Sequence, residues 1–265
     1  MALLPPDARI GEVSLAVSSL DRSLAFYTEV LGFRLHNQSG TAAALGANPT
    51  DVLLRLEQIP GAIRRPRRSS GLYHIAILVP DRAALGRSLR RLAEREWPLT
   101  GASDHLVSEA LYLDDPDGLG IEIYRDRPRD TWRFEGTEVA MATEPLDLND
   151  VAREPGAEQP WAGLDAGTRI GHVHLHVPDL QQAEALYCNS IGFTPTLRRY
   201  PGALFVAAGS YHHHLGLNVW AGAGAPPPPE HAVGLSGFTI EARGLTPGVV
   251  LDPATSVAVT QVPVG

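Results

Sequence analysis

Cysteine is nearly absent from this chain: Cys188 is the only one, so no internal disulfide can form. One cysteine in 265 residues fits a reducing compartment and favours the cytoplasm. Positive charge is also scarce, because 22 Lys and Arg stand against 30 Asp and Glu and leave a formal net charge of −8. That balance disfavours a polyanionic partner such as DNA or RNA.

Long apolar runs are absent too. None approaches the roughly 18 residues that a membrane helix needs, and residues 1–9 lack the basic and apolar regions of an export signal. We therefore expect a globular protein with no membrane partner. Cys188 lies in a helix-like stretch, residues 183–190. A nucleophile is one interpretation of it, and packing in the interior is the one that we favour.

One unit of sequence occurs twice. The segment Ser19–Phe33 recurs without gaps as Asp179–Phe193, with apolar residues at helical spacing and a glycine that suits a helix C-terminus. Each copy follows a stretch of alternating apolar residues, Ile10–Val17 and Ile170–Val177, which predicts a half-buried strand. Three short strands are expected after each helix, the last of them in the later copy at about His213–Trp220.

A second kind of unit begins at Gly71–Val79, with a predicted helix over about Arg82–Glu96 and strands near Glu109–Leu113 and Gly120–Tyr124. Its partner begins at Gly234–Ala242 and is short, because the expected helix is nearly missing. We therefore predict an α+β fold of four βαβββ modules, the fourth of them truncated. The modules are residues 8–60, 70–128, 168–222 and 233–263, and the acidic residues 129–167 connect the two halves.

Module two carries an ordered set of polar residues: His105, Tyr112, the turn Asp115-Pro116-Asp117-Gly118, and Glu122. Proline and glycine in that turn suit a tight connection between two strands. Glu122 lies between two isoleucines in a strand and must point away from them. It either faces solvent or, if it is buried, needs a partner such as a metal.

His74 is the other candidate ligand of module two. GLYHIAI aligns without gaps to GLSGFTI, which sets Gly237 against His74. Aligning the two Asp-Pro turns sets Val259 against Glu122. Module four has therefore lost the polar set that module two carries.

Histidines are concentrated in module three. His172, His174 and His176 alternate along one strand and share a face, which is either a polar outer face or a ligand-bearing one. His172 matches His74 in strand position, with His174 as the alternative. Three consecutive histidines, residues 212–214, are either a surface patch or part of the site, and in a strand only the middle one, His213, would point opposite to its neighbours.

Together these motifs resemble the vicinal oxygen chelate superfamily, which includes glyoxalases, bleomycin resistance proteins and extradiol dioxygenases. GLYHIAIL, HLVSEALYLDDPDGLGIE, GHVHLHV and YHHH are similar to segments of bacterial catechol-2,3-dioxygenases. Ser103 departs from the pattern, where Gly, Asn, Thr or an aliphatic residue is usual. The resemblance covers nearly the whole chain apart from the connection and the shortened end.

The resemblance implies two cupped mixed β-sheets with flanking helices, and a divalent metal inside one cup. Because module four is empty, we expect modules two and three to form that cup. The implied metal is Fe(II), with Mn(II) as the alternative, bound by His74, Glu122 and His172. His213 would be the acid–base catalyst, while Tyr112 and His105 would hydrogen-bond the substrate.

The implied function is extradiol cleavage of a catechol-type diol by O2. Two alternatives stay open. One is a glyoxalase-like isomerase or hydrolase with a fourth ligand, for which Asn218 or His214 is the candidate. The other is a small-molecule-binding resistance protein without catalysis. A homo-oligomer is a further expectation, since the truncated module leaves an apolar face that a second subunit could cover.

Overall fold

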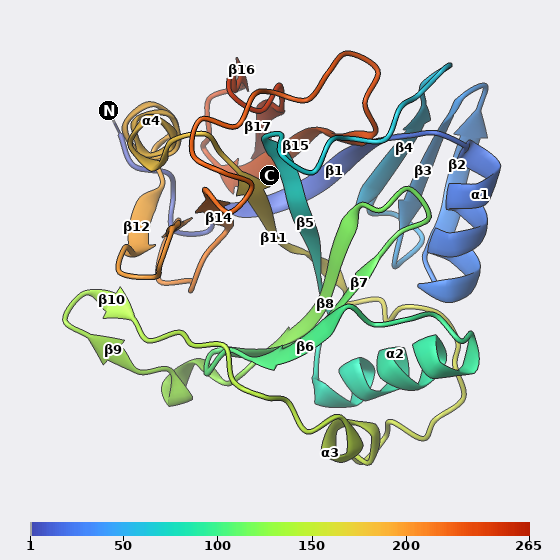
Figure 1. The fold of residues 1–265 in the computed structure, drawn as a ribbon. Coiled ribbons are helices and arrows are strands. Elements are labelled where there is room, and N and C mark those ends of the chain that lie inside the picture. The colour runs from blue at the N-terminus through green and yellow to red at the C-terminus, as the bar shows by residue number, and fades with distance from the viewer. Residues whose placement is uncertain (1) are drawn as a thin grey trace.

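Two mixed β-sheets carry the fold, and each combines strands far apart in the sequence (Figure 1). A computed structural model describes residues 2–265. The first sheet has seven strands in the order β16 (Gly248–Leu251), β17 (Ala258–Val264), β15 (Gly234–Arg243), β1 (Arg9–Val17), β4 (Leu54–Gln58), β3 (Ala42–Gly46) and β2 (Arg34–Ser39). Its strands come from the first and last parts of the chain.

The second sheet has eight strands and joins the two middle parts of the chain. Their order is β12 (Thr194–Leu197), β13 (Ala203–Ala207), β14 (Leu215–Asn218), β11 (Arg169–His176), β5 (Gly71–Leu78), β8 (Gly120–Asp126), β7 (Ser108–Asp114) and β6 (Gly101–Asp104). The α+β class with two curled sheets is confirmed, and the strands of modules two and three share a sheet. The exact module boundaries stay a prediction.

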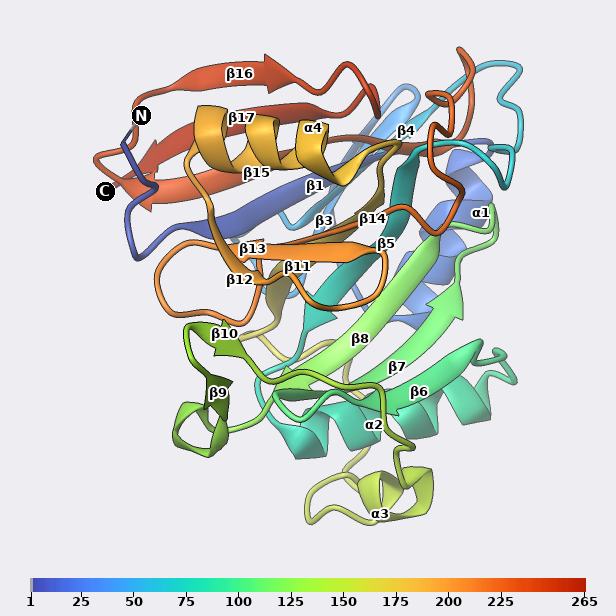
Figure 2. The same cartoon turned by 60° about the vertical axis from the view of Figure 1, so that its left-hand side comes forward.

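Short helices lie outside the sheets, and Figure 2 shows α2 beneath β6, β7 and β8. Each α-helix begins after a Ser or Asp whose side chain accepts an N–H from the residue three positions on, which satisfies a helix-end donor. The α-helices are α1 (Leu20–Ala25), α2 (Arg82–Glu94), α3 (Leu148–Ala152) and α4 (Leu180–Glu184). Helices α1 and α4 continue as π-helical turns over Phe26–Val30 and Ala185–Ile191. A 3-10 turn covers Arg129–Thr131.

The core lies between the two sheets, and strand alternation decides which side chains enter it. Ile75 and Ile77 of β5 and Val173 of β11 belong to the buried apolar cluster that spans both sheets. Their neighbours His74 and Ala76 therefore point to the opposite face of the second sheet. That face carries the site described below.

Pairing in the first sheet corrects the alignment of module four. Val259 lies in the core and pairs with Phe238, whereas Thr260 pairs with Thr239 and Val249. The turn before β17 is one residue longer than its counterpart in module two, so Thr260, and not Val259, holds the place of Glu122. The conclusion that this module lacks the ligand set is unchanged.

Some elements differ from prediction. The strand expected over His213–Trp220 is shorter, since β14 begins at Leu215 and the three histidines precede it. Strand β6 was not predicted. The connection over 129–167 contains a small hairpin, β9 (Phe134–Glu135) and β10 (Glu138–Val139), besides α3. Among residues 2–265, no helix combines the length and apolar character needed to cross a membrane.

Candidate metal centre

The centre is laid out by the register of three neighbouring strands. Ala76 of β5 pairs with His172 of β11 on one side and with Glu122 of β8 on the other. Adjacent strands are roughly 4.8 Å apart, so His172 and Glu122 stand two strand spacings apart with only a methyl group between them. His74, two residues before Ala76, projects from the same face. The small side chain of Ala76 thus leaves space for a cation between three potential ligands.

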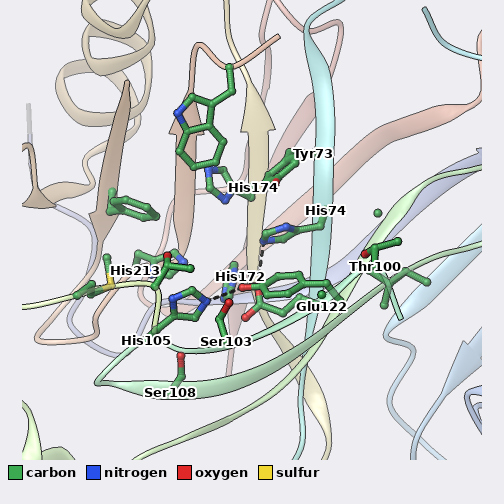
Figure 3. Close-up of a pocket in the computed structure, with 18 of the residues that line it drawn as sticks. Tyr73, His74, Thr100, Ser103, His105, Ser108, Glu122, His172, His174 and His213 are labelled. Carbon is green, nitrogen blue, oxygen red and sulfur yellow. Dashed lines mark hydrogen bonds and ion pairs between the residues drawn. The ribbon is translucent and has the colours of Figure 1, made fainter. Parts of the chain in front are cut away.

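His74, Glu122 and His172 converge on one point, as Figure 3 shows. One ligand atom from each lies within 4.8 Å of the other two, and all three residues are buried. The Oε2 atom of Glu122 is 3.0 Å from Nε2 of His74 and 3.1 Å from Nε2 of His172. The Nε2 atom of His74 nevertheless makes no hydrogen bond.

Burial and charge act on this group in opposite directions. Burial raises the pKa of Glu122, but the nearby His172 and His74 outweigh it and hold that pKa well below 4.5. Burial also lowers the pKa of His172 to about 4, although Glu122 opposes the change. Near neutral pH Glu122 is therefore ionised and His172 is neutral, and these are the protonation states in which a carboxylate and an imidazole bind a metal.

The residues present fit a divalent transition metal. Two imidazoles and one carboxylate on one side of a site, with the other side open, are typical of oxygen-activating iron(II). A buried carboxylate needs a compensating charge, and Nε2 of His74 is buried without a hydrogen-bond partner, so a cation between the three residues would satisfy both.

A pocket of about 550 Å³ opens above the three residues. Its walls come from β5, β7, β8, β11 and the loops around them, and both polar and aromatic side chains face it. Other than the three candidate ligands, the residues that line it include Tyr73, Ser103, His105, Tyr112, Met141, Ala142, Thr143, His174, Tyr200, Phe205, His213 and Trp220. This volume accommodates a small organic molecule with room to spare.

Tyr112 and His105 form a hydrogen-bonded pair at one side of the pocket. The Tyr112 hydroxyl donates to Nε2 of His105 over 2.6 Å, and Nδ1 of His105 donates to the Ala142 carbonyl over 2.6 Å. Burial, followed by the charge of Glu122, raises the pKa of Tyr112 well above 10.0. Tyr112 therefore keeps its proton and donates it in the hydrogen bond to His105.

Comparison with known proteins shows which protein family the chain belongs to. The model of the Glyoxalase/Bleomycin resistance protein/Dioxygenase superfamily matches residues 9–123. A protein of Bacillus subtilis (strain 168) named catechol-2,3-dioxygenase is 49% identical over 245 residues, which covers 91% of this chain and 85% of that protein. The chain belongs to the glyoxalase/bleomycin resistance protein/dioxygenase superfamily. Its predicted family membership is confirmed.

Solved structures of the superfamily share the fold at low sequence identity. A putative dioxygenase of Bacillus subtilis has a TM-score of 0.59 at 16% identity, covering 97% of this chain and 86% of that chain. Glyoxalase I of Zea mays has a TM-score of 0.57 at 16% identity, covering 96% and 92%. Both are similar in fold alone.

Module three has three histidines on one face of β11, and each of them has different surroundings. His172 lies beside Glu122, whereas His174 pairs across the strands with His74 and lies farther out in the pocket. Nε2 of His174 is buried without a partner, and Nδ1 of His176 bonds the Asn218 amide oxygen over 2.7 Å. Of the three, only His172 belongs to the potential metal group.

All three consecutive histidines are buried, so they are not a surface patch. His213 lines the pocket, with its ring centroid 4.2 Å from that of His172. His212 lies behind it and bonds both His213 and Asp126. His214 accepts the backbone N–H of Ala208 at Nδ1. Because these residues precede β14, strand alternation does not govern them.

Sequence reasoning missed several pocket residues. Met141, Ala142 and Thr143 belong to the segment predicted only as a connection, yet they form part of the pocket wall. Tyr73 and Trp220, whose ring centroids are 5.5 Å apart, also line the pocket and are partly exposed to solvent. Nothing in the sequence around residues 141–143 indicates that they line a pocket. Tyr73 could have been predicted as a pocket residue, because it is an aromatic residue directly beside His74.

Cys188 lies away from the pocket. It is half-buried against the apolar core, and burial raises the pKa of its thiol to about 11. A thiol with that pKa stays protonated near neutral pH and is a poor nucleophile. The packing interpretation of this residue is therefore the better supported one.

Proposed function

We propose that this protein is an extradiol ring-cleaving dioxygenase acting on a catechol-type diol and O2. The observation that carries the proposal is the convergence of His74, Glu122 and His172 in a chain 49% identical to a catechol-2,3-dioxygenase. The proposed metal is a mononuclear Fe(II), with Mn(II) as the alternative. When bound, it would supply Lewis-acid and redox chemistry and orient the diol.

The surrounding side chains have complementary tasks in this proposal. His213, at the pocket wall beside His172, would take a proton from a diol hydroxyl and later return it. Tyr112, which keeps its proton, would turn its hydroxyl from Nε2 of His105 and donate that hydrogen to a substrate oxygen on which charge develops. The apolar and aromatic walls would exclude water and hold the ring against the ligands.

The alternatives receive less support. In residues 2–265 the convergent group has three ligating side chains and not four. His214 faces the Ala208 amide, and the side-chain oxygen of Asn218 bonds His176, so neither candidate for a fourth ligand belongs to the group. A binding protein without catalysis would have no need of a buried carboxylate between two histidines. We also propose a cytoplasmic location, in keeping with the lone cysteine.

The test is oxygen consumption with catechol after anaerobic loading with Fe(II). We expect about one metal per chain, O2 uptake that depends on catechol, and a yellow product absorbing in the visible range. Glu122→Gln is the matched control, because it removes a charge and keeps the size, and it should lose both metal and uptake. Metal binding without any catechol-dependent uptake would point to an isomerase.

A further inference from the structure

Behind His213, a chain of buried polar groups leads away from the pocket. Nδ1 of His213 is 2.7 Å from Nδ1 of His212, and Nε2 of His212 is 2.9 Å from Oδ1 of Asp126. His212 has 1% of its surface exposed and His213 has 8%, so water does not satisfy these nitrogens in place of the protein. Asp126 is partly exposed at the far end.

The directions of the hydrogen bonds follow from the carboxylate. An ionised carboxylate only accepts, so Nε2 of His212 must carry the hydrogen. A neutral imidazole has one donor and one acceptor, so Nδ1 of His212 accepts. The hydrogen between the two histidines therefore belongs to Nδ1 of His213. This leaves Nε2 of His213 without hydrogen and with a free lone pair.

Neighbouring rings hold this arrangement in place. The Tyr211 hydroxyl donates to the same Oδ1 atom of Asp126 over 3.1 Å and lies 2.8 Å from the Tyr124 hydroxyl. The His212 ring packs between Tyr211, at a centroid distance of 4.1 Å, and Trp132, at 5.3 Å. With the carboxylate and the ring both fixed, His212 has no freedom to rotate and exchange its nitrogens.

We propose that Asp126 and His212 are positioning residues that fix the tautomer of His213, so that its Nε2 atom is the one ready to accept a proton. The inference rests on the proposed function for its consequence but not for its geometry. In the reaction, the O–H bond of a diol hydroxyl would break and an N–H bond would form at Nε2. The substrate becomes a phenolate and His213 an imidazolium, whose Nδ1–H still donates to His212.

His212, which directly precedes His213, links that residue to Asp126. Without that link, the buried His213 could carry its hydrogen on either ring nitrogen. A hydrogen on Nε2 would prevent that atom from accepting a proton. A carboxylate two groups away removes that choice without placing a negative charge beside the metal group. Sequence reasoning could not find Asp126, which lies 86 residues from His212.

The first test is independent of activity. Metal-free protein labelled with 15N-histidine would be examined by long-range proton–nitrogen NMR, with His212 and His213 assigned from the signals lost in His212→Asn and His213→Gln. We expect hydrogen on Nδ1 of His213 and on Nε2 of His212. Hydrogen on Nε2 of His213 in the wild-type protein would overturn the proposal.

The second test separates positioning from packing. His212→Leu fills a similar space without accepting a hydrogen bond, and it should lower kcat roughly 100-fold while KM for catechol stays within about twofold. His212→Asn keeps an acceptor at the Nδ1 position and should recover at least a tenth of wild-type kcat. His214→Asn changes the adjacent buried histidine, which does not belong to the hydrogen-bonded series His213–His212–Asp126. This variant should keep kcat within about threefold of the wild-type value.

Equal losses in His212→Leu and His212→Asn, or a loss of bound metal in proportion to activity, would contradict the proposal. Failure of the wild-type protein to consume O2 would instead refute the proposed function, and the NMR result would still decide the tautomer. The two failures are thus distinguishable.

Discussion

At the residue scale, the candidate metal centre depends on one small side chain as much as on its three proposed ligands. Ala76 has paired neighbours His172 and Glu122, and it is fully buried. Any larger residue there would fill the space between them. The sequence left His172 and His174 as alternatives because both share a strand face, and this register places His172 beside Glu122.

His213 gives the most direct test of a single side chain. Replacing it with glutamine keeps a polar side chain of similar length but removes the proton acceptor. We expect kcat to fall by roughly 10²–10⁴-fold with metal content unchanged, measured by oxygen uptake and metal analysis on the same sample. Near-wild-type kcat in this variant would remove His213 from the mechanism.

Asp115 makes stability depend on pH. It is buried, accepts the backbone N–H groups of Asp117 and Leu119 at Oδ1, and accepts the Tyr27 hydroxyl at Oδ2. Burial is the main reason that its pKa is raised from 3.8 to about 6. The folded state therefore holds the proton more tightly than the unfolded state does. This contribution to stability is complete below about pH 4 and is lost as pH rises through 6.

Asp115→Asn should abolish that dependence. A pKa change from 3.8 to about 6 corresponds to about 3 kcal/mol. Between pH 4 and pH 8, the free energy of unfolding of the variant should therefore rise relative to that of the wild type by up to that amount. Urea unfolding at both pH values would measure it. An identical difference in unfolding free energy at pH 4 and pH 8 would contradict the assignment.

At the scale of elements, the repeat preserves a contact whose residues lie outside the candidate metal group. The Tyr27 hydroxyl donates to Asp115 over 3.2 Å, and the Tyr187 hydroxyl donates to Asp252 over 2.8 Å. Each tyrosine comes from the helix of one module and each aspartate from the Asp-Pro turn of the next. Module four has no helix after its first strand and none of the polar set, but its Asp-Pro turn still binds the helix of module three.

Tyr187→Phe tests the importance of that anchor. Removing the hydroxyl leaves Oδ2 of Asp252 with only the Thr255 hydroxyl as a side-chain donor, and we expect a loss of roughly 1–3 kcal/mol in unfolding free energy. Urea unfolding measures it. Tyr200→Phe, which removes an exposed bond to Thr143, is the matched control and should cost much less.

At the scale of the whole molecule, the metal would join the two middle modules. Its proposed ligands come from β5, β8 and β11, three adjacent strands that meet only in the folded second sheet. The unfolded chain separates these ligands by tens of residues. Metal binding is therefore coupled to the folding of the sheet.

Metal removal should consequently lower the melting temperature. At a Mn(II) concentration near a thousand times Kd, binding stabilises the folded state by about 4 kcal/mol, which corresponds to roughly 8–16 °C for a chain of this size. Calorimetry with Mn(II) and with a chelator would measure the difference. Glu122→Gln should show almost no metal-dependent shift, and a full shift in that variant would place the metal elsewhere.

The sequence by itself indicated the repeat and the α+β class, because strand alternation and helical spacing are local properties of the chain, and the resemblance of its motifs to a known superfamily pointed to His74, Glu122 and His172 as candidates. It also indicated that module four lacks ligands. The one-residue insertion that puts Thr260 at the position equivalent to Glu122 became visible only through strand pairing. Tertiary structure alone decided which strands are neighbours, which of the histidines meets Glu122, and that Asp126 stands behind His212. These depend on contacts between residues far apart in sequence, and such contacts are set by the packing of whole sheets, which leaves no local pattern.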